Sequence, residues 1–317
     1  MNDDFYKAVE EEILSLMPES YKDYTVRIDE VNKSGDVKMH GISLIKGNSG
    51  AAPILYLDPY KEMYEQGIPK DHILKNIADT YCEIVKKAPV VNMPDMSFES
   101  IKDDLRVRLV YNRTNYDYLK QYVHKDVGCG YCLVVYADFS DKLFDGAIVN
   151  IRKDMLDKFG FDERVLIDAA IEGSVKHCPA KLTYITDELF SLMSDREKEN
   201  LLEKDKIDLS RGILVLTTED RFAGAATMFY PGVLEKAGKL IDWDYFVLPS
   251  SIHEVLLIPA DGRYSARDLA QMVKSVNSAE VSREEQLGNR VLFYDRVNEQ
   301  LCVLCDLDRG KNREDAR

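Results

Sequence analysis

The chain has 317 residues, which corresponds to two domains if each takes roughly 150 residues. Asp and Glu outnumber Lys and Arg by 56 to 42, so the net charge is −14. No run of Lys and Arg is longer than two residues, and an acidic chain without a basic patch is not expected to bind nucleic acid. No apolar run reaches the ~18 residues of a membrane span, so we expect no membrane partner either.

The N-terminal stretch MNDDFYKAVEEEIL has neither the positive charge nor the apolar run of a signal peptide. We therefore expect a cytoplasmic protein, in which cysteines stay reduced. The chain has six cysteines: Cys82, Cys129, Cys132, Cys178, Cys302 and Cys305.

The first 95 residues alternate helical and extended patterns. Apolar residues at spacings of three and four predict an amphipathic helix, which Pro18 ends. Two extended runs around a Gly-containing turn predict a hairpin. The predicted elements are a helix at 3–17, strands at 24–31, 37–45 and 53–57, and helices at 58–66 and 71–87.

Residues 89–97 contain two prolines and form the predicted linker. The predicted organisation is an N-terminal α+β unit over 1–95, a C-terminal α+β unit over 96–305 and a charged, mobile tail over 306–317.

The second predicted unit is richer in strands. Strands are expected at 105–111, 131–139, 147–151, 213–218, 245–248, 255–258, 290–294 and 301–304. Helices are expected at 115–123, 153–159, 162–177, 231–240 and from 266 onward. Residues 186–206 are charged and helical in character, with a capping-box pattern at 194–197, and the segment from 213 is βαβ-like.

A weak internal repeat relates two strand–helix–Gly–helix segments. Residues 54–78 match residues 147–171 with an offset that aligns Gly67 with Gly160. A repeated structural unit would explain this match, and chance similarity is the alternative. The predicted fold class is α+β, with mixed, mainly antiparallel sheets flanked by helices, organised as two related α/β units if the repeat is real.

Two Cys-x-x-Cys pairs, Cys129/Cys132 and Cys302/Cys305, suggest a zinc site. The second pair lies in a predicted strand, where residues three apart face opposite sides. The better metal hypothesis joins His124, Cys129 and Cys132 with His177 or Cys178 as a fourth ligand. Buried free cysteines also behave as small apolar residues. We favour that interpretation and expect no metal and no other cofactor.

The most polar connection between two apolar runs is Pro249-Ser250-Ser251-Ile252-His253-Glu254. Ser, His and Glu close together suggest a hydrolase, with Ser250, Ser251, His253 and Glu254 as catalytic candidates. However, the nucleophile elbow G-x-S-x-G and the metalloprotease pattern H-E-x-x-H are both absent. The alternative is a polar turn whose side chains bond to the backbone.

The chain also has 18 tyrosines. Tyrosine suits interfaces because it buries a ring while its hydroxyl stays wet, although core packing explains the same residues. Two clusters stand out: Tyr56, Tyr60 and Tyr64, and Tyr111, Tyr116, Tyr118 and Tyr122.

Several long segments match a family pattern: MNDDFYKAVEEEI, ILYLDPYKEMYEQG, LVYNRTNYDYL, GAATMFYPGVLEKAG, VLPSSIHEVLLIPADG and MVKSVNSAEVS. Together they resemble an uncharacterised Firmicutes family, domain of unknown function 5688, over nearly the whole chain. PSSIHE is the most specific string. The family has no established activity, so the resemblance implies an architecture and no site.

Three functional hypotheses remain. The first is a cytoplasmic, non-enzymatic interaction or regulatory protein, with a protein partner that the sequence does not identify. The second is a hydrolase-like enzyme that uses Ser250 or Ser251 with His253 and Glu254. It would gain support from a pocket that gathers His253, Glu254 and a residue from another segment. The third is a zinc-binding protein that uses Cys129 and Cys132.

Overall fold

The structure is a computed structural model that describes residues 4–47, 52–87, 96–142, 147–191 and 199–309. The chain forms two compact units. The first comprises Met1–Lys33 and Val37–Pro94, and the second comprises Ser34–Asp36 and Asp95–Arg317. Most of the predicted linker (89–97), most of the predicted tail (306–317) and the predicted capping box at 194–197 lie outside the described residues.

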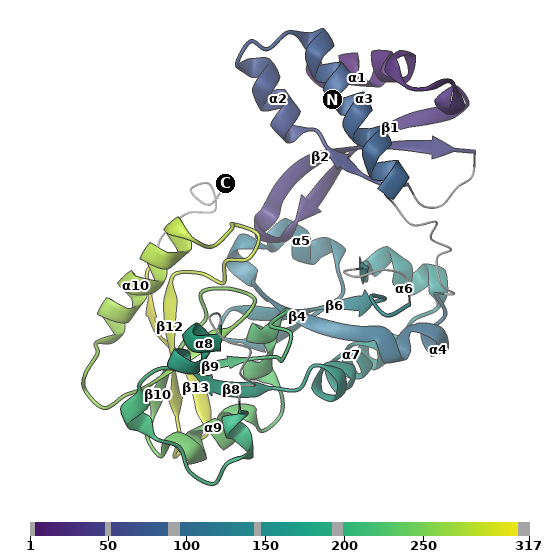
Figure 1. Cartoon of the computed structure of the whole chain (residues 1–317). Coiled ribbons are helices and arrows are strands. Elements are labelled where there is room, and N and C mark those ends of the chain that lie inside the picture. The colour runs from purple at the N-terminus through teal and green to yellow at the C-terminus, as the bar shows by residue number, and fades with distance from the viewer. Residues whose placement is uncertain (1–3, 48–51, 88–95, 143–146, 192–198, 310–317) are drawn as a thin grey trace. The chain divides into compact units, whose positions relative to one another are not determined.

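The first unit is a three-stranded antiparallel sheet with helices packed on it (Figure 1). Its elements are α1 (Asp4–Leu16), β1 (Tyr24–Lys33), β2 (Val37–Lys46), β3 (Leu55–Tyr56), α2 (Asp58–Glu65) and α3 (Lys70–Lys87). The predicted hairpin is confirmed, because β1 pairs with β2 from Tyr24↔Lys46 to Lys33↔Val37. The core joins Phe5, Val9 and Ile13 of α1 to Ile73 and Ile77 of α3.

The second unit begins with a four-stranded antiparallel sheet. Its strands are β4 (Leu105–Tyr111), β5 (His124–Gly128), β6 (Tyr131–Asp138) and β7 (Ile148–Asn150). β6 lies between β4 and β5 and also pairs with β7. The accompanying helices are α4 (Phe98–Ile101), α5 (Tyr116–Gln121), α6 (Lys153–Phe159) and α7 (Glu163–His177).

The two segments of the internal repeat adopt the same element order. The first runs β3, α2, α3, and the second runs β7, α6, α7. In each, the aligned glycine follows the first helix with a positive φ, 87° at Gly67 and 67° at Gly160. This backbone conformation favours glycine after a helix end, so the aligned glycines serve one local geometry in both units.

A six-stranded sheet completes the second unit. Its elements are β8 (Lys181–Tyr184), α8 (Ile185–Ser191), β9 (Leu214–Thr217), α9 (Val233–Ile241), β10 (Tyr245–Leu248), β11 (Val255–Pro259), α10 (Ala266–Ala279), β12 (Arg290–Asp295) and β13 (Gln300–Asp306). The strand order is β13-β12-β10-β11-β9-β8, and each pair of neighbouring strands is antiparallel.

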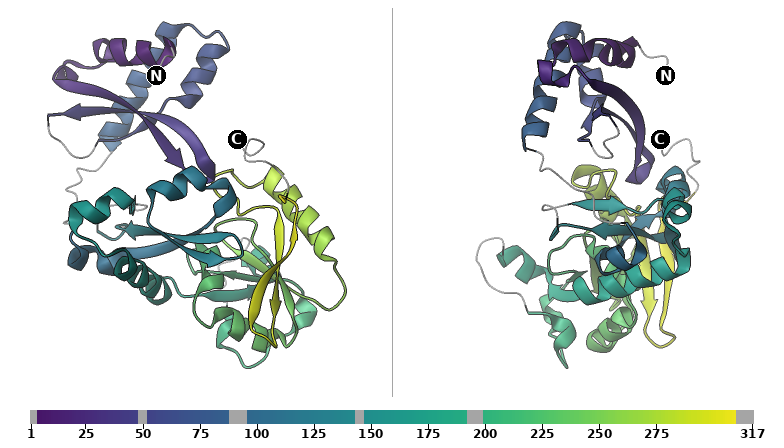
Figure 2. Two further views of the ribbon diagram at one scale, coloured as in Figure 1. Left: turned by 180° about the vertical axis from the view of Figure 1, so that it is seen from behind. Right: turned by 90° about the vertical axis from the view of Figure 1, so that its right-hand side faces the viewer.

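Helices cover both faces of this sheet. α10 packs against β12 and β13, and Figures 1 and 2 show the helix beside these strands. Leu234, Ala237 and Ile241 of α9 pack on the opposite face, in a core that also includes β4 and β6 of the other sheet. One continuous apolar core therefore joins the two sheets of the second unit.

The α+β prediction is confirmed, with antiparallel sheets flanked by helices. The βαβ-like expectation from residue 213 is wrong in one respect. β9 and β10 are not neighbours, because β11 lies between them and is antiparallel to both. Among the described residues, no helix combines the length and apolar character that crossing a bilayer requires.

Candidate functional site

The polar segment Pro249–Glu254 connects β10 to β11, as the apolar runs on either side predict. Its backbone is bonded to the segment after α10. The Ile252 N–H donates to the carbonyl of Glu285 at 3.0 Å, and the Leu287 N–H donates to the carbonyl of Ser250 at 3.1 Å. Because the connection is held at both positions, its side chains project from a fixed backbone.

A second segment, residues 217–225, fixes the other side of the connection. The Thr217 hydroxyl donates to the carbonyl of His253 at 2.7 Å, and the Ala225 N–H donates to that of Ile252 at 3.1 Å. A Cβ on Gly224 would lie 2.2 Å from Thr217 Oγ1 and 2.3 Å from the His253 carbonyl oxygen. Only glycine lets the two segments approach this closely.

Two residues beside Gly224 adopt left-handed backbone conformations that are unusual for side chains with a Cβ. Arg221 has φ of 59° and Ala223 has φ of 52°. Such residues cost of order 1 kcal/mol or more each and tend to occur at functional sites. Here they turn the Arg221 carbonyl oxygen towards the ring of His253.

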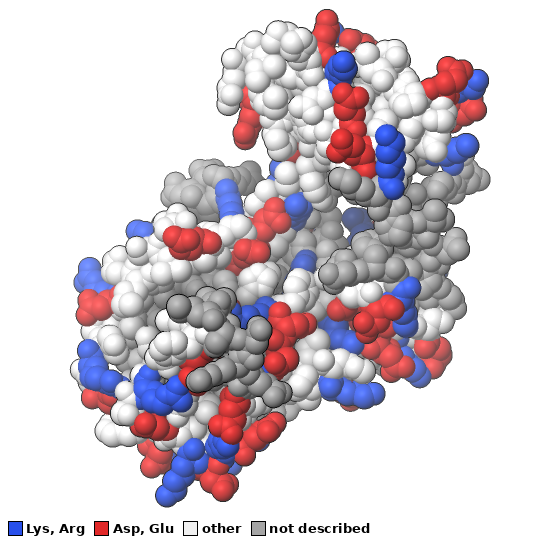
Figure 3. Space-filling model, in the orientation of Figure 1, with Lys and Arg blue, Asp and Glu red and all other residues white. Residues whose placement is uncertain are grey.

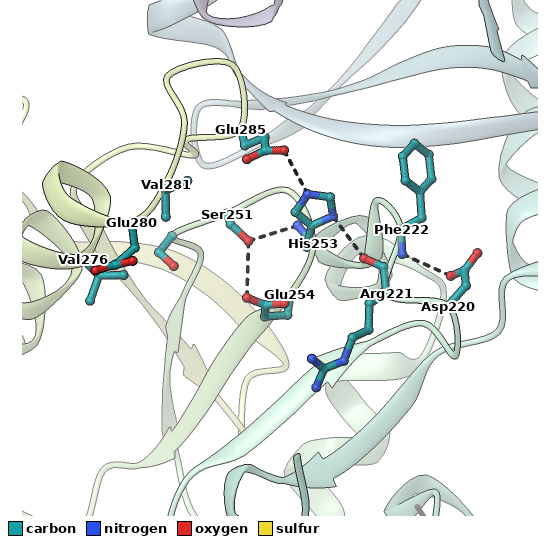
Figure 4. Close-up of a pocket in the computed structure, with 11 residues that line it drawn as sticks. Asp220, Arg221, Phe222, Ser251, His253, Glu254, Val276, Glu280, Val281 and Glu285 are labelled. Atoms are coloured by element: carbon teal, nitrogen blue, oxygen red, sulfur yellow. Dashed lines mark hydrogen bonds and ion pairs between the residues drawn. The ribbon is translucent and has the colours of Figure 1, made fainter. Parts of the chain in front are cut away.

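The imidazole of His253 lies between two hydrogen-bond acceptors (Figure 4). Nδ1 is 3.1 Å from the carbonyl oxygen of Arg221, and Nε2 is 3.2 Å from Oε1 of Glu285. A neutral imidazole has one N–H, so only the imidazolium donates to both at once. The side chain is 32% exposed.

The two serines do not complete a nucleophile–base pair. Ser251 is buried, and its Oγ accepts from the His253 backbone N–H at 3.2 Å and donates to Glu254 Oε1 at 3.4 Å. Ser250 contributes its carbonyl oxygen to the backbone pairing with Leu287. Both ring nitrogens of His253 face acceptors other than a serine hydroxyl, so the Ser–His hydrogen bond that the hydrolase hypothesis requires is not formed.

These segments line an open cavity of about 540 Å³, within the size range of small-ligand sites. The lining residues are Asp220, Arg221, Phe222, Ser250, Ser251, His253, Glu254, Val276, Glu280, Val281 and Glu285. All belong to the second unit. The cavity therefore gathers His253 and Glu254 with carboxylates from two other segments.

Carboxylates dominate the charge of this cavity. Asp220, Glu254, Glu280 and Glu285 stand against one guanidinium, that of Arg221. Arg221 is itself paired with Glu188, which does not line the cavity. Burial alone would raise the pKa of Glu285, but hydrogen bonds from Ser282 and His253 and the charge of His253 lower it overall. The cavity thus presents negative charge that its own residues only partly neutralise.

The candidate metal ligands His124, Cys129 and Cys132 each have separate partners. Cys132 is buried in a small apolar cluster with Tyr118 and Val134, and the Cys129 thiol donates to the Leu301 carbonyl at 3.4 Å. His124 Nδ1 lies 2.9 Å from the Tyr122 carbonyl oxygen. Burial raises the pKa of the Cys132 thiol to about 11, which disfavours the thiolate.

His177 and Cys178, the candidates for a fourth ligand, lie at the C-terminal end of α7. In the part of the chain that the structure describes, no three His, Cys, Asp or Glu side chains are placed to share a metal ion.

The expectation that Cys302 and Cys305 face opposite sides of their strand is wrong. Residues 302 and 305 do lie in a strand, but the β12–β13 pairing contains a bulge. Cys302 is opposite Phe293 and Cys305 is opposite Val291. Since residues two apart on β12 share a face, the two cysteines share a face as well.

The second tyrosine cluster is mostly core, whereas no member of the first cluster is fully buried. Tyr111, Tyr118 and Tyr122 are buried, whereas Tyr64 and Tyr116 are exposed. On the face shown in Figure 3, basic and acidic side chains are interspersed. The described residues of that face therefore offer no basic patch as a docking signal.

Sequence reasoning found one wall of the cavity and missed the other two. The other two walls come from Asp220–Phe222 and from Glu285. Arg221 and Glu285 are each 32 residues away from His253 in the sequence. The positions show no motif or periodic pattern. Only the strand order, which places β9 beside β11, brings the Asp220–Phe222 loop to the connection.

No match was found among curated proteins or among solved structures. One family model, described as Family of unknown function (DUF5688), matches residues 2–296. This match covers nearly all of the first unit, most of the second and every residue that lines the cavity, and it ends before β13. The chain therefore belongs to the DUF5688 family.

Proposed function

We propose that this protein is a cytoplasmic, non-enzymatic binding protein whose acidic cavity receives a cationic side chain, lysine or arginine, of a protein partner. The observation that carries the proposal is the composition of the cavity. Four carboxylates line it together with the apolar side chains of Phe222, Val276 and Val281. A lysine or arginine has a matching division, with an apolar stem and a charged head.

The fixed backbone supports binding rather than catalysis. The connection between β10 and β11 is bonded on both sides, so the carboxylate of Glu254 and the ring of His253 are held in place. A preorganised site loses little conformational entropy when a ligand binds. The His253 ring, held by Glu285 and by the Arg221 carbonyl, then acts as a structural bridge between two walls of the cavity.

The cavity also brings His253, Glu254 and the distant Glu285 together, which favours the hydrolase alternative. Against it, both ring nitrogens of His253 are engaged by acceptors, and a general base must reach the proton that it abstracts. The alternative predicts ester or amide hydrolysis that is lost in Ser250→Ala or in Ser251→Ala, whichever serine is the nucleophile. We expect no serine-dependent hydrolysis of p-nitrophenyl acetate above the level of a His253→Gln variant.

Calorimetric titration tests the proposal with three capped amino acids: N-acetyl-lysine, N-acetyl-arginine and N-acetyl-norleucine methylamides. The lysine and arginine probes should bind, and binding should weaken with salt because the charges are partly exposed. Norleucine has the same stem without the charge and should not bind. Equal binding of norleucine would refute a cationic ligand.

Variants locate the binding. Glu280→Gln combined with Asp220→Asn removes two exposed carboxylates of the cavity. Each exposed pair contributes about 0.5–1 kcal/mol, so affinity should fall about five- to thirty-fold for the double variant. Glu203→Gln, an exposed residue outside the cavity, is the matched control and should bind like the wild type. A similar loss in Glu203→Gln would place the effect in overall charge instead.

A further inference from the structure

The β-bulge between β12 and β13 aligns two thiols that the sequence spacing separates. β13 has one more residue than β12 between the pairs Phe293↔Cys302 and Val291↔Cys305. The packing agrees with this register. Val291, Phe293 and Cys305 contact the apolar cluster under α10, whereas Leu292 and Leu301 belong to the core on the opposite face.

Both thiols are free and accessible at the margin of the sheet. Cys302 is exposed and Cys305 is half-buried. β13 is an end strand of the six-stranded sheet. The two residues between them, Val303 and Leu304, are uncharged and are 37% and 50% exposed. Neither therefore offers a positively charged side chain that would pair with the thiolates.

The spacing of this pair selects one chemistry over another. Val291 and Phe293, the partners of the two cysteines on β12, are two residues apart, which corresponds to about 6.8 Å along a strand. The two cysteines opposite them have a similar spacing. A disulfide needs Cβ atoms about 3.5–4.5 Å apart, which is closer than this two-residue spacing, so a bridging metal atom suits the pair better than a direct sulfur–sulfur bond. A metal atom with two metal–sulfur bonds of about 2.3 Å spans roughly 4.6 Å between sulfurs, which the side chains reach by rotating towards each other.

We propose that Cys302 and Cys305 form a two-thiolate binding site for a soft monovalent metal ion, the cuprous ion. Soft thiolates select Cu(I), and a d¹⁰ monovalent ion accepts two ligands in a near-linear arrangement. On binding, each thiol releases its proton to solvent, two copper–sulfur bonds form, and the complex carries one negative charge. Copper stays in the cuprous state throughout, so the step needs no oxidant or reductant.

Zinc does not fit the same pair. Structural zinc takes four protein ligands and catalytic zinc takes three. No third His, Cys, Asp or Glu of the described chain joins the pair to make a group that could hold a metal. The two-coordinate site therefore discriminates by coordination number as well as by ligand softness.

The test is an anaerobic titration of the reduced protein with the cuprous acetonitrile complex, with bicinchoninate as competing chelator. The wild type should hold one more equivalent of copper than Cys302→Ser or Cys305→Ser, each of which should bind about 100-fold more weakly or not at all. Cys178→Ser removes another half-buried thiol and is the matched control, which should retain the copper. Ultraviolet thiolate-to-copper absorption follows the same event independently.

Two results would overturn the proposal. One is copper binding unchanged in Cys302→Ser. Its position is exposed, so folding does not confound the result if Cys305→Ser proves unstable. The other is an equal loss in Cys129→Ser, whose thiol lies against Leu301 next to Cys302. That outcome would replace the two-thiolate site by one that includes Cys129.

Discussion

Gly224→Ala should loosen the attachment of the polar connection to the rest of the site. The added Cβ would lie 2.2 Å from Thr217 Oγ1 and 2.3 Å from the His253 carbonyl oxygen, which itself belongs to the backbone. The methyl group therefore has to push the two segments apart. The hydrogen bond from Thr217 Oγ1 to that carbonyl, now 2.7 Å long, is lost in the process.

The expected cost follows from these two effects. Overpacking costs about 1–3 kcal/mol, and the lost hydrogen bond adds about 1 kcal/mol. The smaller backbone entropy of alanine in the unfolded chain returns about 0.5–1 kcal/mol. The net loss is about 1–3.5 kcal/mol, a large fraction of the 5–15 kcal/mol typical of a domain.

Trp243 makes the measurement specific. It is the single tryptophan of the chain and lies two residues before β10 in the second unit. Its fluorescence in urea should give a midpoint about 1 M lower for Gly224→Ala, if m is about 2 kcal/mol/M.

Gly262→Ala is the control. Its φ is +89°, and no atom lies within 4 Å of the added Cβ. Only backbone strain of about 1–2 kcal/mol acts there, and the cavity should still bind the lysine probe. A cost for Gly224→Ala that is no larger than that of Gly262→Ala, with binding intact, would refute the close-approach argument.

Three further predictions concern the second unit and use the same tryptophan fluorescence. The pKa of Glu285 is lowered from its ordinary 4.5, so the carboxylate stabilises the fold above pH 4.5, and this stabilisation is lost as pH falls through the folded pKa. The wild type should therefore lose more stability than Glu285→Gln between about pH 5 and 3. Equal losses in the two proteins would contradict the pairing of Glu285 with His253. Asp306→Asn breaks a 2.6 Å ion pair with Arg290 in which both side chains are almost fully buried. The free energy of unfolding should therefore fall by about 3–5 kcal/mol. A fall of less than about 1 kcal/mol would show that the pair is solvated. Tyr245→Phe removes a buried 2.9 Å hydrogen bond and should lower the free energy of unfolding by about 1 kcal/mol. Tyr294→Phe removes a buried hydroxyl with no partner among the described residues and should leave stability unchanged or raise it. A larger loss in Tyr294→Phe than in Tyr245→Phe would contradict this assignment of the two hydroxyls.

Long apolar runs made much of the fold predictable. Residues 105–111 and the helix 153–159 match β4 and α6 residue for residue, because burial on a sheet face and the 3.6-residue period leave clear patterns. β5 and β8 were missed. β5 carries only one apolar residue in its five (HKDVG), and β8 is a four-residue strand that begins with a buried lysine, Lys181. Their strand character comes from pairing with β6 and β9, which no local pattern encodes.

The site was predictable only where it is local. Polar residues between two apolar runs located the connection from Pro249 to Glu254, since a rigid scaffold commonly carries such residues. The acceptors of His253 come from loops that meet it through the strand order. The β-bulge of β13 is a similar case, because the extra residue is visible only against its partner strand.

The most direct test of the central claim is a chemical-shift map of the cavity by heteronuclear NMR. N-acetyl-lysine methylamide should perturb the ring nitrogens of His253 and the backbone amides of Phe222, Glu254 and Val281, which line the cavity. N-acetyl-norleucine methylamide should leave them unchanged. Shifts of equal size with both probes, or shifts confined to residues away from this cavity, would contradict the account.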